Sequence, residues 1–260
     1  MDAFPLDLAR TRYSYIERPN TVLVSLLEDR VLSGSSRARV LDVGCGCGAN
    51  ARALKERYPS VVIDGIEPNE RAAELAREVC DSVFHGISTD WIAQSPTGTR
   101  YDAVVLSDVL EHIADPIAFL NELARAPQLK HATFIVSVPN YAVWYNRIST
   151  LLGRFEYAWS GLYDRTHLRF YTRRSIAKVL SYCGLEAIET RCTPSLVQSA
   201  APVLRKLFDK EVEAGEHLAL TESTAFKLYR TVVEPAETRI CSLAPGLLGF
   251  QIVLAARATG

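Results

Sequence analysis

The sequence predicts an α/β fold built on a doubly wound, mostly parallel sheet, and two features of the chain indicate it. Apolar runs of strand length alternate with stretches of helical periodicity across most of the 260 residues. The first buried run, residues 40–43, breaks into glycines at positions 44, 46 and 48, as expected where a strand turns sharply into a helix. We therefore expect one domain, residues 1–260, rather than two small ones.

The expected elements follow one another in strand–helix order. A helical segment within residues 1–36 comes first. Strands are then expected at residues 40–43, 61–66, 82–84, 101–106, 133–138, 185–191 and 249–257, helices at 51–57, 71–80 and 175–183, a polar loop at 94–100 and a helical insertion at 194–246. Asp115 followed by Pro116 predicts a further helix start, because aspartate caps free amides and proline fits the first turn.

The glycine turn and the end of the next strand form the first candidate site. Glycines allow positive φ and let a ligand lie against the backbone without a Cβ in the way. The run 61–66 ends in Glu67, whose carboxylate can accept hydrogen bonds from a ribose diol. Together they predict a nucleotide-type cofactor across the carboxyl ends of two parallel strands. The spacing G-x-G-x-G is neither the dinucleotide fingerprint nor a phosphate-binding loop, which needs a following Lys-Ser/Thr pair.

This segment resembles motif I of the class I S-adenosylmethionine-dependent methyltransferases, and the resemblance runs from about residue 39 to 185 and resumes in the last strand. It implies S-adenosyl-L-methionine as cofactor and a seven-stranded sheet of order 3-2-1-4-5-7-6 with the last strand antiparallel. The residues that the resemblance assigns to the cofactor are Asp42, Gly44, Cys45, Gly46, Gly48, Glu67, Pro68, Ile87 and Ser107.

A second group of polar residues follows the fourth strand. If residues 108–112 turn helically, Asp108, Glu111 and His112 lie at i, i+3 and i+4 and share one face. His167 comes later, in a loop before a helix. Carboxylates and imidazole at the mouth of an α/β sheet indicate a divalent-cation site.

These residues resemble the E-x-x-E-H motif of the ubiquinone-biosynthesis O-methyltransferases and of the small-RNA 2′-O-methyltransferases, with Asp108 in place of the first Glu. In the RNA enzymes a downstream histidine completes the metal site, and His167 matches it. The resemblance implies Mg²⁺ or Mn²⁺ held by Asp108, Glu111, His112 and His167, with both histidines catalytic. Two alternatives stay open: a metal-free histidine base, and residues that only stabilise the structure.

A bound cation would stabilise a developing alkoxide and orient a vicinal diol, so the expected reaction is O-methylation of a small polyhydroxylated acceptor. A sugar hydroxyl is favoured, on a nucleotide-sugar, a glycan or a glycosylated metabolite, because residues 138–172 resemble methyltransferases of bacterial surface-polysaccharide pathways. The alternatives are a catechol or phenol acceptor, and a non-catalytic accessory protein of the methyltransferase type. Aromatic residues between positions 141 and 163, with Tyr13 and Tyr15, are candidates for lining the acceptor cleft.

The net charge and the cysteines indicate which class of partner and which cellular compartment to expect. Lys plus Arg total 29 against 30 acidic residues, and the formal net charge of -1 disfavours a nucleic-acid substrate. The N-terminus lacks the pattern of a signal peptide, and no apolar run reaches the roughly 20 residues of a membrane span. The six cysteines are scattered, as in a reducing cytosol. We expect a soluble cytoplasmic protein and leave open whether it forms a homo-oligomer.

Overall fold

The computed structural model describes residues 18–34, 37–95, 98–158, 161–194 and 234–259. Its sheet has the strand order β3-β2-β1-β4-β5-β7-β6, and only β7 runs antiparallel to its neighbours, which confirms the predicted topology. The strands are β1 (Arg39–Val43), β2 (Val62–Glu67), β3 (Ser82–His85), β4 (Ala103–Ser107), β5 (Thr133–Pro139), β6 (Leu185–Cys192) and β7 (Gln251–Ala258).

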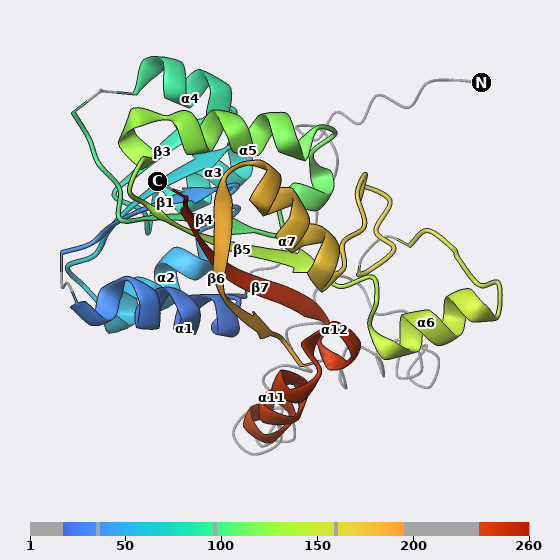
Figure 1. The fold of residues 1–260 in the computed structure, drawn as a ribbon. Helices are drawn as coiled ribbons and strands as arrows, with labels where there is room; N and C mark the ends of the chain where they lie inside the picture. The colour runs from blue at the N-terminus through green and yellow to red at the C-terminus, as the bar shows by residue number, and fades with distance from the viewer. Residues whose placement is uncertain (1–17, 35–36, 96–97, 159–160, 195–233, 260) are drawn as a thin grey trace, which may run out of the picture.

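Helices cover both faces of this sheet (Figure 1). They are α1 (Thr21–Arg30), α2 (Ala49–Arg57), α3 (Glu70–Ala76), α4 (Ser88–Gln94), α5 (Pro116–Arg125), α6 (Trp144–Leu151), α7 (Arg173–Tyr182), α11 (Glu234–Leu243) and α12 (Pro245–Leu248). Short 3₁₀ turns occur at Leu32–Gly34, Leu110–His112 and Pro127–Leu129. The first three helices pack on one face, and α4, α5 and α7 pack on the other.

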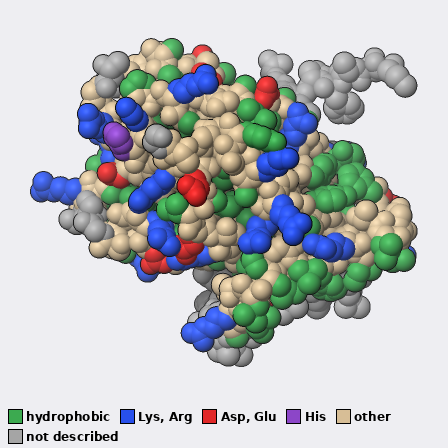
Figure 2. All heavy atoms as spheres, viewed as in Figure 1, with side chains coloured by type: hydrophobic (Ala, Val, Ile, Leu, Met, Phe, Trp, Pro, Cys, Tyr) green, Lys and Arg blue, Asp and Glu red, His purple; other side chains and the backbone are tan. Residues whose placement is uncertain are grey.

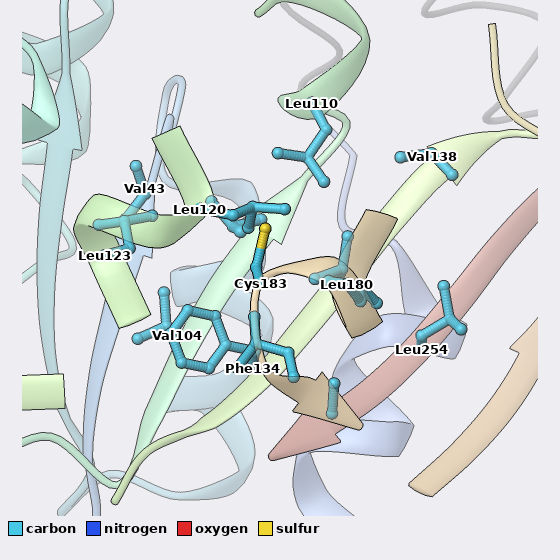
Figure 3. Packing of buried hydrophobic residues seen from close by; sticks show 14 of the residues in the cluster. Val43, Val104, Leu110, Leu120, Leu123, Phe134, Val138, Leu180, Cys183 and Leu254 are labelled. Carbon is cyan, nitrogen blue, oxygen red and sulfur yellow. The ribbon is translucent and has the colours of Figure 1, made fainter. Parts of the chain in front are cut away.

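The inner strands β1, β2, β4, β5 and β7 are buried on both faces, so their apolar side chains alternate between two cores. Val104 and Leu106 face the core under α5 and α7, whereas Val105, between them, faces the core under α1 and α2. Figure 3 shows the first core, where Leu120 and Leu180 lie over Phe134 and its neighbours. These two cores fix the sheet and therefore the edge at which its parallel strands end.

Helix starts follow local sequence signals. The Asp115 side chain accepts a hydrogen bond from the Ala118 amide at 3.0 Å, and Pro116 occupies the first turn of α5, which confirms the predicted cap. Thr172 and Ser175 form a reciprocal capping box at the start of α7.

Several predicted boundaries were wrong. The helix expected at 71–80 ends as α3 at Ala76, and the short helices α4 and α6 were not predicted. Of the insertion expected at 194–246, the described part contains α11 and the start of α12, which continues to Leu248; residues 195–233 lie outside the described residues, as do residues 1–17 of the N-terminal segment. Within the described part, no helix has the length and apolar character to cross a membrane.

Candidate functional site

The glycine turn after β1 is held by the end of β2. The amides of Gly44 and Cys45 both donate to the Ile66 carbonyl, at 2.8 and 3.1 Å, and the Gly48 amide donates back to the Cys45 carbonyl at 3.0 Å. All three glycines of the turn have positive φ, between 54° and 79°. This is the backbone that the sequence predicts, because L side chains rarely adopt such angles.

Gly44 also lies against the segment that follows β4. A Cβ at this position would lie 2.8 Å from Cγ2 of Val109, closer than side-chain atoms pack. The glycine therefore brings the cofactor turn into contact with the chain that carries the second candidate site.

Glu67 lies at the end of β2, as predicted, and spans the turn. Its Oε2 accepts the Gly46 amide and its Oε1 accepts the Asn69 amide, both at 2.9 Å. A carboxylate oxygen can accept more than one hydrogen bond, so this arrangement leaves capacity for a ligand at the same edge.

Asp42 is the buried acid of the site. It is 2% exposed, and its Oδ1 has no hydrogen-bond partner among the described residues. Burial, and next the negative charge of Glu67, raises the pKa of Asp42 from 3.8 to about 7. A buried carboxylate without a partner is costly, and a bound cationic or donor group would relieve that cost.

The other residues assigned to the cofactor contribute unequally. The Cys45 side chain turns under β2, since a Cβ on Gly65 would lie 2.6 Å from its sulfur. Only the backbone of Cys45 therefore faces the turn. Pro68 is exposed, Ile87 is 53% exposed just before α4, and Ser107 ends β4, so these three stand at the expected edge of the sheet.

The second site brings together Glu111, His112 and His167. Each offers one ligand atom, and these atoms lie within 4.8 Å of one another. Glu111 is 1% exposed, and neither of its carboxylate oxygens has a hydrogen-bond partner among the described residues. No other group of this kind occurs in the described part of the chain.

Backbone hydrogen bonds join the two segments that supply these residues. The carbonyl of Glu111, in the 3₁₀ turn, accepts the amides of Leu168 and Arg169 at 2.7 and 3.0 Å. The Tyr171 hydroxyl donates to the Leu110 carbonyl at 3.2 Å. The site is therefore a product of tertiary structure rather than of one helix face.

Both imidazoles are oriented by backbone carbonyls. Nδ1 of His112 lies 3.2 Å from the Thr166 carbonyl, and Nδ1 of His167 lies 3.2 Å from the Leu162 carbonyl. A carbonyl can only accept, so Nδ1 carries the proton in each ring and Nε2 carries the lone pair. This is the arrangement that usually accompanies a metal-ligating histidine.

Burial disfavours the charged form of each side chain in the cluster. Burial, and next the nearby Asp108, raises the pKa of Glu111 well above its usual value. Burial, and next the proximity of His167, lowers the pKa of His112 from 6.5 to about 4, and burial also lowers the pKa of His167. Near neutral pH both histidines are thus neutral, as a metal ligand must be.

The expectation that Asp108 shares a helical face with the other two residues is wrong. Asp108 has φ 55°, and only Leu110–His112 forms a helical turn, of the 3₁₀ type. Its carboxylate instead accepts the Ser137 hydroxyl at 3.1 Å and the Gln251 side-chain amide at 2.6 Å. Asp108 is therefore not a member of the cluster of Glu111 and the two histidines. Burial raises its pKa to about 6.

Aromatic rings connect the cluster to the segment after β5. Phe170 lies 6.5 Å from His167, centroid to centroid, and Tyr141 lies 5.2 Å from Phe170. Phe155 contacts Tyr163 at 4.8 Å and Phe170 at 5.9 Å. Of the other aromatic residues expected at the cleft, Tyr13, Tyr15 and Trp159 lie outside the described residues.

Some residues that shape the site were not predicted. The carbonyls of Leu162 and Thr166 orient the histidines, and backbone acceptors leave no signature in a sequence. Ser137 holds Asp108, and its position as a polar residue within the apolar fifth strand is a signal that could have identified it.

Comparison with known proteins places these features in a family. The model of the family described as "Methyltransferase domain" matches residues 15–190. A ubiquinone biosynthesis O-methyltransferase of Dinoroseobacter shibae is 29% identical over 160 residues, covering 59% of this chain and 62% of the relative. One of Alkalilimnicola ehrlichii is 34% identical over 100 residues, covering 36% and 39%. The chain thus matches only part of the length of these curated relatives.

The fold has a counterpart among solved structures. A SAM-dependent methyltransferase from Archaeoglobus fulgidus superposes with a TM-score of 0.51 at 18% identity, covering 91% of this chain and 93% of that one. At this identity the likeness speaks for the fold alone. The strand order, the glycine turn and the family match over most of the chain agree, and the chain belongs to the methyltransferase domain family.

Proposed function

We propose that the protein is an S-adenosylmethionine-dependent O-methyltransferase whose acceptor carries two adjacent hydroxyl groups. The observation that carries the finer part of this proposal is the buried, unpartnered Glu111 carboxylate beside two oriented histidines. The family match and the names of the curated relatives support the methyl-transfer part.

The cofactor edge fits S-adenosylmethionine in both charge and shape. Glu67, at the end of β2, suits the ribose hydroxyls, and the exposed side chain of Ile87 suits packing against the flat face of the base. The unpartnered Oδ1 of Asp42 suits the cationic methionine end of the cofactor. When bound, the cofactor supplies an electrophilic methyl group on sulfur.

The second site fits a divalent cation. A buried carboxylate and two neutral imidazoles with carbonyl-bound Nδ1 are a mixed N/O donor set, suited to Mn²⁺ and similar ions. Glu111, His112 and His167 would hold the ion, and Asp108 would shape the site through its charge. When bound, such an ion lowers the pKa of a hydroxyl group and fixes its orientation.

The histidines are better suited to bind a cation than to act as a metal-free base. Burial lowers the pKa of His112 to about 4 and also lowers the pKa of His167, and a weaker base takes a proton from an aliphatic hydroxyl less readily. In the net reaction the acceptor oxygen forms a bond to the methyl carbon, the sulfur–carbon bond breaks, and the hydroxyl proton leaves to solvent. The chain contributes by placing that hydroxyl in line with the methyl group and by excluding water.

The acceptor class follows from the cation site and the rings beside it. Adjacent hydroxyls on a flat ring or a sugar suit both a two-oxygen contact and the aromatic surface of Tyr141, Phe155 and Phe170. The curated relatives are named for ubiquinone biosynthesis, which favours a catechol-type acceptor. The sequence resemblance of residues 138–172 favours a sugar, and both acceptors belong to the vicinal-diol class.

The test is formation of S-adenosylhomocysteine with a panel of paired acceptors. Each catechol or sugar diol is compared with its analogue lacking one of the two hydroxyls, with Mg²⁺ or with a chelator. We expect turnover only with diols and a loss of turnover with chelator. Glu111→Gln should reduce turnover by about tenfold to a hundredfold. Glu74→Gln on the exposed side of α3 is the matched control. Full turnover of mono-hydroxyl analogues in chelator would refute the diol and cation assignments.

A further inference from the structure

Several apolar side chains at the end of α6 and just after it are exposed to solvent. Ile148, Leu151 and Leu152 lie at i, i+3 and i+4, so they share one side of the helix end, and they are 51%, 86% and 62% exposed. Phe155 and Tyr157 follow, with ring centroids 5.4 Å apart, and both are exposed. We name these five residues the α6 surface. Figure 2 shows hydrophobic and Lys/Arg side chains side by side over this part of the molecule.

The segment that carries this surface is rich in arginine. Residues 141–174 contain six arginines and no lysine, against two acidic residues, whereas the whole chain has a formal net charge of -1. The six arginines are Arg147, Arg154, Arg165, Arg169, Arg173 and Arg174, and all are exposed.

Five of these arginines, all except Arg165, form no ion pair with a carboxylate among the described residues. Arg147 and Arg169 donate to backbone carbonyls, of Ala142 and Ala114 respectively. None of the ion pairs formed among the described residues includes Arg154, Arg173 or Arg174. The segment therefore carries a local excess of positive charge that an anionic partner would complement.

We propose that the α6 surface docks on an anionic lipid bilayer. Exposed leucine and isoleucine beside arginines, with a tyrosine at the border, is the pattern of a segment that lies in the membrane interface. A protein partner is less well matched, because the most exposed side chains of this surface are Leu151 and Leu152, and leucine is under-represented among the residues that carry the binding energy of protein interfaces. RNA would use the arginines and rings but would gain nothing from the aliphatic side chains of α6.

Docking here would bring the cation site close to the lipid. Phe155, part of the α6 surface, contacts Phe170 at 5.9 Å, and Phe170 is 6.5 Å from His167. The rings form a continuous path from the exposed surface to the second site. An acceptor held in the bilayer interface would then approach the site without crossing water. The docking itself does not depend on the proposed function.

The test is co-sedimentation of the full chain with vesicles. Vesicles of phosphatidylcholine alone are compared with vesicles containing about a quarter phosphatidylglycerol, at low and high salt. We expect binding to the anionic vesicles that weakens with salt, and a loss of about tenfold in partition coefficient for Leu151→Glu and for Arg154→Glu. Leu75→Glu and Arg77→Glu, at exposed positions in and just after α3, are matched controls and should bind as wild type.

Two results would overturn the proposed docking on lipid. Absence of binding to anionic vesicles would overturn it, and so would equal losses in the α3 and α6 variants. Binding of a short single-stranded RNA that is lost in Arg154→Glu but unchanged in Leu151→Glu, without vesicle binding, would assign the arginines to nucleic acid instead. Circular dichroism of each variant establishes that the fold is retained.

Discussion

The buried acid Asp42 is expected to lower the stability of the cofactor-free protein. Its pKa is raised from 3.8 to about 7, so the folded state disfavours its ionised form. As pH rises from 3.8, the unfolded chain releases this proton first, and stability is lost until the folded carboxyl ionises near pH 7. At about 1.4 kcal/mol per pH unit, the loss totals about 4 kcal/mol.

Asp42→Asn removes this ionisation but retains a buried polar group, whose unmade hydrogen bonds cost about 1–3 kcal/mol. We expect the variant to be no more stable than wild type near about pH 4.5 and more stable near about pH 8. Between these two conditions, the difference in unfolding free energy should change by about 3 kcal/mol. At the same time the variant should bind S-adenosylhomocysteine more weakly, since it lacks the negative charge.

The assay is urea unfolding of the cofactor-free protein, followed by tryptophan fluorescence at a series of pH values. Comparing each variant with wild type at the same pH cancels the titration of all other groups. Glu74→Gln, at an exposed position on α3, is the matched control variant and should change the unfolding free energy only slightly. A stability difference for Asp42→Asn that is the same at every pH would contradict the raised pKa of Asp42.

Three further predictions concern the glycine turn, the ribose acid and the segment after β5. Gly44→Ala should cost about 2–4 kcal/mol of unfolding free energy, because of the positive φ of Gly44 and the clash of a Cβ with Val109. In urea titrations of the double variant, Val109→Ala should recover only the part of this loss that the clash causes. Glu67→Ala should weaken S-adenosylhomocysteine binding by about tenfold or more in calorimetry, and unchanged affinity would show that the ribose assignment is wrong. Asn140→Ala should cost about 1–3 kcal/mol in thermal unfolding, because its buried amide donates to the Gly249 carbonyl at 2.8 Å and accepts the Ala142 amide at 3.1 Å; a loss within error would contradict this.

Features set by local chemistry were predicted from the sequence. The glycine turn requires positive φ at three positions, and Glu67 is the last residue of its strand. The cap at Asp115 likewise depends on residues within one turn. Such signals survive in the sequence because few residue types satisfy them.

Features set by distant contacts were not predicted. Asp108 departs from the helical expectation because Ser137, on β5, and Gln251, on β7, hold its carboxylate. Helix α6 was missed because none of its apolar residues is fully buried, so its pattern does not mark a buried face. The pairing of His112 with His167 was expected from the family resemblance, while the carbonyls that orient them depend on the fold.

The cation site proposed at Glu111, His112 and His167 can be tested without knowledge of the acceptor. The most direct measurement is Mn²⁺ titration by electron paramagnetic resonance in the presence of S-adenosylhomocysteine, for wild type, Glu111→Gln, His167→Ala and the control Glu74→Gln. We expect stoichiometric Mn²⁺ binding in wild type and in the control, and its loss in the other two variants. Equal binding in all four proteins, or binding in none, would contradict it.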